Sequence, residues 1–155
     1  MSQVPTLYGR WRTVVPQPGS AMFTYSMTIQ LHHADAYGIL FFANQFLFCH
    51  DVFQAWMSSE GMALAKNRQS ARFVAVVVHA ESDYLATVEL GDQLEIRLQN
   101  LSVGTTSFTN GFTFVNQHGI TVGRARTVMV AIDPATSKKV PVPDMLREAL
   151  EGLRG

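Results

Sequence analysis

The stretch Asp35-Ala36-Tyr37-Gly38-Ile39-Leu40-Phe41-Phe42-Ala43-Asn44 stands where a strand pattern gives way to a helix pattern. It places one carboxylate three residues before a glycine and just ahead of an aromatic-rich helix start. The first N–H groups of a helix lack intrahelical partners and carry the positive end of the helix dipole. They can hold a developing oxyanion while a nearby aspartate attacks or activates water. This stretch therefore combines a carboxylate and oxyanion donors, the groups that cleavage of an acyl bond requires.

The patterns on either side of this stretch predict the remaining elements. Apolar and polar residues alternate over residues 22–31, which is typical of a half-buried strand. After the stretch, apolar residues recur at helical steps of four and three, and a glycine follows at Gly61, where we expect the helix to end. The helical stripe consists of Phe42, Phe46, Cys49, Phe53 and Trp56.

Four further strands and a short helix are expected downstream. The apolar run 73–78 is typical of a strand covered on both faces, and residues 67–71 form a polar link before it. The later strands are expected over residues 94–98, 108–114 and 120–132, and the terminal helix from Pro143 to near Gly155. We expect residues 1–20 to be an N-terminal arm and residues 21–155 to be one domain.

Composition excludes several classes of partner. The chain has 155 residues, which fits one domain, and its 12 basic and 12 acidic side chains give no net charge. Without a basic block or stripe, nucleic acid is not expected as a partner. No apolar run reaches the ~18 residues that span a bilayer, so no membrane is expected either. The single cysteine, Cys49, excludes an intrachain disulfide and suits a reducing cytoplasm.

The order of elements requires a sheet that curls around one long helix and leaves an exposed edge, which pairing with a second subunit would cover. The pattern Asp35, Gly38, Phe41-Phe42 and Asn44 resembles the signature of the 4-hydroxybenzoyl-CoA thioesterase branch of the hotdog fold. Similar features are Gly91-Asp92 before an alternating strand and the ending Asp133-Pro134…Lys138…Pro143. The segment 44–51 with Trp56 more narrowly resembles the 1,4-dihydroxy-2-naphthoyl-CoA hydrolases.

The resemblance covers residues 23–150 and implies an α+β hotdog fold, with a five-stranded antiparallel sheet wrapped around the helix and a short C-terminal helix. It also implies that the protein is an acyl-CoA thioesterase and forms a homodimer or homotetramer.

The resemblance further implies roles for individual residues. Asp35 matches the family's catalytic carboxylate, as nucleophile or general base, and Gly38 matches the glycine that lets the loop approach the thioester. The N–H of Phe42 corresponds to the donor that polarises the thioester carbonyl, and Asn44 matches a position that fixes the helix start. His33 stands where the family often has a second acid.

Other candidates come from residue chemistry. An aromatic or bulky acyl group is suggested by Tyr37, Phe41, Phe42 and Phe46, and Asp51 is a candidate second acid. The candidates for the CoA phosphates are Arg124, Arg126, Lys138 and Lys139, although the two arginines share a strand face with Val128 and Val130 and could instead pair at an interface. We expect no metal, because His32 and His33 would point to opposite faces of a strand. Apart from the coenzyme A of the substrate, no cofactor is expected.

Three alternatives stay open at this point. Asp35 could simply satisfy a turn through its own side chain. A non-catalytic acyl-CoA binding module would explain the fold but not a carboxylate beside a helix start. A hotdog hydratase would call for a histidine five residues after Asp35, where this chain has Leu40.

Overall fold

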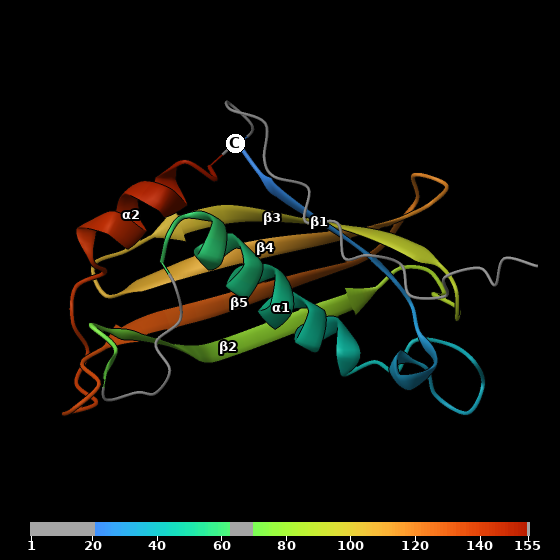
Figure 1. Ribbon diagram of the computed structural model, residues 1–155, viewed down its shortest axis with the longest axis horizontal. Coiled ribbons are helices and arrows are strands. Elements are labelled where there is room, and N and C mark those ends of the chain that lie inside the picture. The colour runs from blue at the N-terminus through green and yellow to red at the C-terminus, as the bar shows by residue number, and fades with distance from the viewer. Residues whose placement is uncertain (1–20, 63–69, 155) are drawn as a thin grey trace, which may run out of the picture.

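The computed structural model describes residues 21–62 and 70–154. In Figure 1 these residues form one antiparallel sheet with a long helix across one face and a short helix beside one end. The expected arm over residues 1–20 and part of the expected link over residues 67–71 lie outside the described residues. The elements are β1 (Phe23–Thr28), η1 (Leu31–His33), α1 (Asn44–Ser59), β2 (Val74–Tyr84), β3 (Gln93–Val103), β4 (Ser107–Asn116), β5 (Thr121–Ile132) and α2 (Asp144–Glu151).

The strand order explains why the helix covers the sheet. The order is β1-β3-β4-β5-β2, with every neighbouring pair antiparallel. The two strands that flank α1 in the sequence are therefore the two edges of the sheet, and the chain between them has to cross its whole width. This arrangement confirms the predicted five-stranded antiparallel sheet, one long helix and short C-terminal helix.

The core lies between α1 and the inward face of the sheet. Alternate residues of β3 are buried, among them Leu94, Ile96 and Leu98, as the period of two predicts. From α1, Phe53 stacks against Phe108 of β4 with ring centroids 6.1 Å apart. Fully burying side chains of this size stabilises the fold by roughly 1.5–3 kcal/mol each, before conformational entropy is counted.

The helix begins two residues later than the apolar stripe that predicted it. Cys49, Phe53 and Trp56 are buried and Phe46 is half-buried, whereas Phe42 precedes the helix and is exposed. Gly61 has a φ of 73° just after the last turn, where glycine is commonly found at helix ends. No helix within the described parts of the chain is both long and apolar enough to span a membrane.

Two predictions about strands are wrong. The run 73–78 does not belong to a strand covered on both faces, because β2 is an edge strand whose residues are mostly exposed. The predicted strand 22–31 ends at Thr28, and Leu31–His33 instead form a single 3₁₀ turn. His32 and His33 therefore do not point to opposite faces, and their ring centroids lie 4.0 Å apart.

Candidate active site

Asp35 opens a tight loop that closes on itself before α1. Its N–H donates to the carbonyl oxygen of Ile39 at 2.8 Å, and the N–H of Gly38 donates back to the carbonyl oxygen of Asp35 at 3.0 Å. Gly38 has a φ of 75°, a conformation that favours glycine. The carboxylate oxygen Oδ1 accepts the N–H groups of Tyr37 at 2.8 Å and of Ile39 at 3.4 Å. Asp35 is thus a turn residue. Its second carboxylate oxygen, Oδ2, accepts no hydrogen bond from any residue that the structure describes.

The start of α1 is fixed to the segment that precedes Asp35. The carbonyl oxygen of His33 accepts the N–H of Phe41 at 3.0 Å and the side-chain amide of Asn44 at 2.8 Å. This contact joins Asn44, the first residue of α1, to the backbone two residues before Asp35. Among the described residues, the N–H groups of Phe42 and Ala43 have no acceptor, so two donors at the positive end of α1 are free.

An isolated antiparallel bridge between Ala34 and Leu40 limits the distance between the carboxylate and these donors. Asp35 pairs with Ile39, and His33 pairs with Phe41. At about 3.4 Å per residue, the chain from Ile39, which pairs with Asp35, to Phe42 spans at most roughly 10 Å. A thioester carbonyl that accepts the Phe42 N–H spans part of this gap, and an aspartate side chain can reach toward its carbon from the other end.

Two residues that the sequence did not single out connect the helix start to the end of β2. The hydroxyl of Tyr84 donates to the carbonyl oxygen of Phe42 at 2.8 Å. The side-chain amide of Gln45, which is 1% exposed, donates to the carbonyl oxygen of Asp83 at 3.1 Å and also bonds the hydroxyl of Ser82. No local pattern marks either residue, because both contacts join segments about forty residues apart.

Gly123 on β5 provides the space for this connection. It pairs with Tyr84 in the register of β2 and β5. A Cβ atom at this position would lie 2.7 Å from Oε1 of Gln45, closer than carbon and oxygen approach without a bond. The missing side chain therefore admits the buried amide to the inner face of the sheet.

The predicted aromatic residues surround the loop and the helix start. Tyr37 is 88% exposed, Phe41 46% and Phe42 61%, and the rings of the two phenylalanines lie 5.0 Å apart. Phe46, in the first turn of α1, is half-buried. Apolar surface grouped in this way suits an apolar ligand or a subunit contact rather than open solvent.

Asp51 lies on the exposed side of α1, near β1 and His33. Burial, with a smaller contribution from the Asp51 carboxylate, raises the pKa of Tyr25. Burial and the neighbouring His32 lower the pKa of His33, against the opposing effect of Asp51. His33 is buried, and its Nδ1 accepts the N–H of Gln30 at 3.0 Å. A neutral His33 cannot replace the negative charge of the acid that the family often has at this position.

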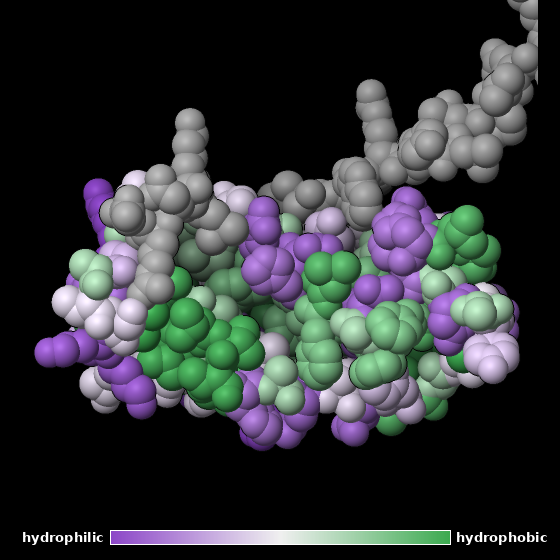
Figure 2. All heavy atoms as spheres, turned by 90° about the horizontal axis from the view of Figure 1, so that it is seen from below, coloured by the Kyte–Doolittle hydropathy of each residue, from purple (hydrophilic) through white to green (hydrophobic). Residues whose placement is uncertain are grey.

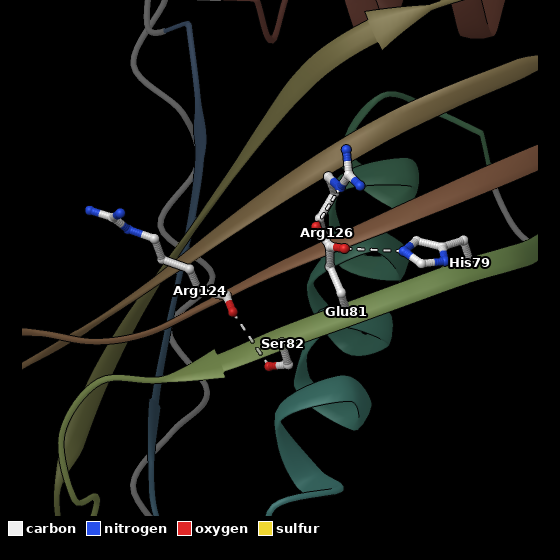
Figure 3. A network of polar contacts seen from close by, with 5 residues as sticks. All are labelled: His79, Glu81, Ser82, Arg124 and Arg126. Carbon is white, nitrogen blue, oxygen red and sulfur yellow. Dashed lines mark hydrogen bonds and ion pairs between the residues drawn. The ribbon is translucent and has the colours of Figure 1, made fainter.

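The two candidate arginines lie on the other face of the sheet from α1, as Figure 3 shows. Arg126 is paired with Glu81 at 2.7 Å between Nε and Oε1, and His79 approaches the other oxygen of Glu81 at 3.2 Å. Hydrogen bonds from His79 and then from Arg126 lower the pKa of Glu81. Arg124 is exposed on the same face. Within one chain, the structure does not bring these arginines to Asp35.

The two candidate lysines lie at the far end of the sheet. Lys138 and Lys139 are exposed in the loop after β5, where Ile132 pairs with Val74. The other end of β2, Tyr84, contacts the helix start and is ten residues away, or about 33 Å along the strand. Along residues 21–62 and 70–154, no three histidine, cysteine or acidic side chains are grouped so that they could hold a metal ion.

Comparison with known proteins supports one family. Residues 29–150 match the family model of the thioesterase-like superfamily. The chain is 30% identical to a 1,4-dihydroxy-2-naphthoyl-CoA hydrolase of Rippkaea orientalis, over 84% of this chain and 96% of that protein. A hydrolase of the same name from Synechococcus elongatus is 28% identical, with the same coverage.

A solved structure agrees in fold. A 1,4-dihydroxy-2-naphthoyl-CoA thioesterase from Synechocystis superposes with a TM-score of 0.77 at 27% identity, over 83% of this chain and 95% of the other. The similarity thus extends over nearly the whole length of these relatives and includes the loop, the helix start and β2.

Proposed function

The chain belongs to the thioesterase-like superfamily and is a thioester hydrolase, and we propose that its substrate is the CoA thioester of an aromatic acid. Two observations support this substrate class. The relatives described above act on 1,4-dihydroxy-2-naphthoyl-CoA, an aromatic thioester. Beside the loop, Tyr37, Phe41 and Phe42 expose aromatic surface against which a planar acyl group can pack.

The proposed mechanism rests on one observation: among the described residues, the Oδ2 of Asp35 accepts no hydrogen bond and the N–H of Phe42, at the other end of the same loop, has no acceptor. A thiolate leaves readily, so the protein mainly needs an attacking oxygen, an oriented carbonyl and a donor for the oxyanion. Asp35 supplies the attack, directly or through a water molecule from which it takes a proton. The N–H of Phe42 stabilises the negative charge that develops on the carbonyl oxygen. These steps require no metal or redox chemistry, and coenzyme A enters only as part of the substrate.

We further propose that two subunits pair along β2. This edge strand exposes 53% of Val77 and 59% of Val78, and Figure 2 shows apolar surface on that side of the molecule. An uncovered apolar edge is prone to pair with another strand. Sedimentation should give at least twice the chain mass of about 17 kDa. Val78→Lys, which adds a charge at this edge, should yield single chains, whereas Leu101→Lys, at a position on β3 that is also about half exposed, should not.

Antiparallel pairing also offers a role for the distant lysines. A symmetric pair centred on β2 places the Val74 end of one strand beside the Tyr84 end of the other. The loop with Lys138 and Lys139 of one subunit then lies near the helix start of its partner and can meet the CoA phosphates. Replacing both lysines should raise KM more than it lowers kcat, because these contacts exist in ground and transition states alike. The same measurement on Arg124 and Arg126 tests the alternative phosphate site.

We place the reaction in the cytoplasm, where the buried thiol of Cys49 stays reduced.

The substrate class is tested by the release of free thiol from a panel of CoA thioesters. Benzoyl, naphthoyl and medium-chain esters should be compared at equal concentration, with equilibrium binding of each ester measured in parallel. We expect the aromatic esters to have the highest kcat/KM. Tight binding of all esters without thiol release would contradict the proposed hydrolysis, and preference for the medium chain would contradict the aromatic pocket.

A further inference from the structure

The hydroxyl of Tyr84 is a long-range contact to the backbone of the helix start. It donates to the carbonyl oxygen of Phe42 at 2.8 Å, although the two residues are 42 positions apart. Phe42 is also the residue whose N–H has no acceptor among the described residues. The carbonyl oxygen of Phe42 is thus held by Tyr84, and its N–H can donate a hydrogen bond to a substrate.

We propose that Tyr84 is a positioning residue for thioester hydrolysis. Its hydroxyl holds the Phe42 carbonyl, and thereby the peptide that carries the Ala43 N–H and the adjoining peptide that carries the Phe42 N–H, so that the free donors at the start of α1 point at the thioester carbonyl oxygen. This inference rests on the proposed role of the Phe42 N–H. It assigns no chemical step to Tyr84 itself. The tyrosine acts through the backbone that it orients.

Among the described residues, the carbonyl oxygen of Phe42 has one other partner besides Tyr84, the backbone N–H of Gln45 at 3.3 Å. Ala43, the N-cap residue, makes no side-chain hydrogen bond to the helix. The contacts to His33 fix Phe41 and Asn44, which flank the residue on either side. Tyr84 is the one described side chain that bonds the Phe42 carbonyl, so its hydroxyl adds a second, shorter contact that fixes how the peptide after Phe42 is turned.

Tyr84 itself is held firmly enough to act as a reference point. It pairs with Gly123 at the end of β2, and the next two N–H groups, of Leu85 and Ala86, both donate to the carbonyl oxygen of Val122 at 2.9 and 3.2 Å. The carbonyl oxygen of Asp83 accepts the buried amide of Gln45. The end of β2 is therefore tied to β5 and to the first turn of α1 at the same time.

A purely stabilising role predicts a different result from a positioning role. Tyr84 is 48% exposed, and a single hydrogen bond from a half-exposed hydroxyl contributes little to folding. Small misplacement of a catalytic donor can nevertheless cost a large factor in rate. The two roles are separated by measuring rate, affinity and the state of the substrate carbonyl in the same variants.

The test compares Tyr84→Phe with Ser59→Ala in the full chain. Ser59 donates its hydroxyl to the carbonyl oxygen of Trp56 at 2.7 Å, so the control removes the same kind of bond from the other end of α1. We expect Tyr84→Phe to lower kcat on the best ester by about tenfold with KM within twofold, and Ser59→Ala to change neither. Circular dichroism and thermal melting should show both variants folded.

The second readout is the vibrational frequency of a ¹³C-labelled thioester carbonyl in benzoyl-CoA bound to the slow variant Asp35→Asn. We expect binding to lower this frequency, and adding Tyr84→Phe to return it toward the free value while Ser59→Ala leaves it lowered. A normal kcat in Tyr84→Phe would overturn the proposal. So would a low kcat in Tyr84→Phe if the carbonyl frequency in the double variant stays as low as in Asp35→Asn alone. Failure of the wild-type chain to hydrolyse any ester would instead overturn the proposed function.

Discussion

The side-chain amide of Asn44 donates to the carbonyl oxygen of His33 across 2.8 Å, which fixes the first residue of α1 to the residue two positions before Asp35. The carboxylate and the helix start are thereby held in one unit. The same oxygen also accepts the N–H of Phe41, so it keeps a partner when the side chain of Asn44 is removed. A substitution of Asn44 therefore allows the start of α1 to move relative to Asp35, and the His33 carbonyl oxygen still accepts one hydrogen bond.

Asn44→Ala should lower activity more than stability. Loss of one hydrogen bond costs about 1 kcal/mol, or about 3 °C in Tm for a domain of this size. We expect kcat to fall about tenfold, because the helix start can move relative to Asp35. Arg147→Ala is the control, since it removes a side-chain hydrogen bond from α2 to the backbone carbonyl oxygen of Gly104. Equal activity of the two variants in a thiol-release assay would contradict the fixing role of Asn44.

His33 should make the fold less stable in mild acid. Burial and His32 lower its pKa below the ordinary value of 6.5, and protonation would remove the acceptor for the Gln30 N–H. The unfolded chain then binds this proton more readily than the folded chain, so stability rises with pH in this window. The contribution of neutral His33 to the free energy of unfolding is complete above about pH 6.5. It is lost progressively as the pH falls toward the lowered pKa of the folded state.

The measurement is the urea midpoint between pH 7.5 and pH 5.0. His33→Asn keeps an acceptor near Nδ1 but cannot be protonated there, so its midpoint should depend less on pH than that of the wild type. His118→Gln removes an exposed histidine from the β4–β5 turn and should leave the wild-type dependence unchanged. Identical slopes for the wild type and His33→Asn would show that His33 does not carry this effect.

Gly123→Ala should be destabilising by about 1–3 kcal/mol, because the new Cβ overlaps the amide of Gln45. Gly111→Ala is the matched control on the neighbouring strand. Its Cβ would meet only the side chain of Leu101 at 3.2 Å, which is half-exposed and can move. Combining Gly123→Ala with Gln45→Ala should cost less than the sum of the two, as measured in a double-mutant cycle by urea unfolding. Additive costs would show that the two residues do not compete for this space.

These residues also show where sequence reasoning was sufficient and where it was not. The loop from Asp35 to Asn44 is local, so its turn and the helix that follows could be predicted from the residue pattern, whereas the role of Gly38 was implied by the resemblance to a family. The alternation in β3 likewise predicted which residues are buried, because each strand face repeats every second residue.

The missed features all depend on pairing between distant segments. An apolar run such as 73–78 does not reveal whether its strand is central or at an edge, since that depends on the order of strands in the sheet. Tyr84, Gln45 and Gly123 form a unit only because β2 and β5 meet below the start of α1. Nothing in their local sequence distinguishes them from ordinary strand and helix residues.

Asp35→Asn is the variant on which the proposed mechanism depends. Asparagine keeps an oxygen that can accept the N–H groups of Tyr37 and Ile39, so the loop should retain its turn and the chain should fold. It loses the charge that attacks the thioester or takes a proton from water. Thiol release should fall by a factor on the order of 10² or more, about 3 kcal/mol of transition-state stabilisation, while affinity for the acyl-CoA changes little. Asp51→Asn, on the exposed side of α1, should have the milder effect if that carboxylate is structural. Near-normal turnover in a folded Asp35→Asn protein would leave Asp35 as a turn residue only, and the attacking group would have to come from elsewhere in the site.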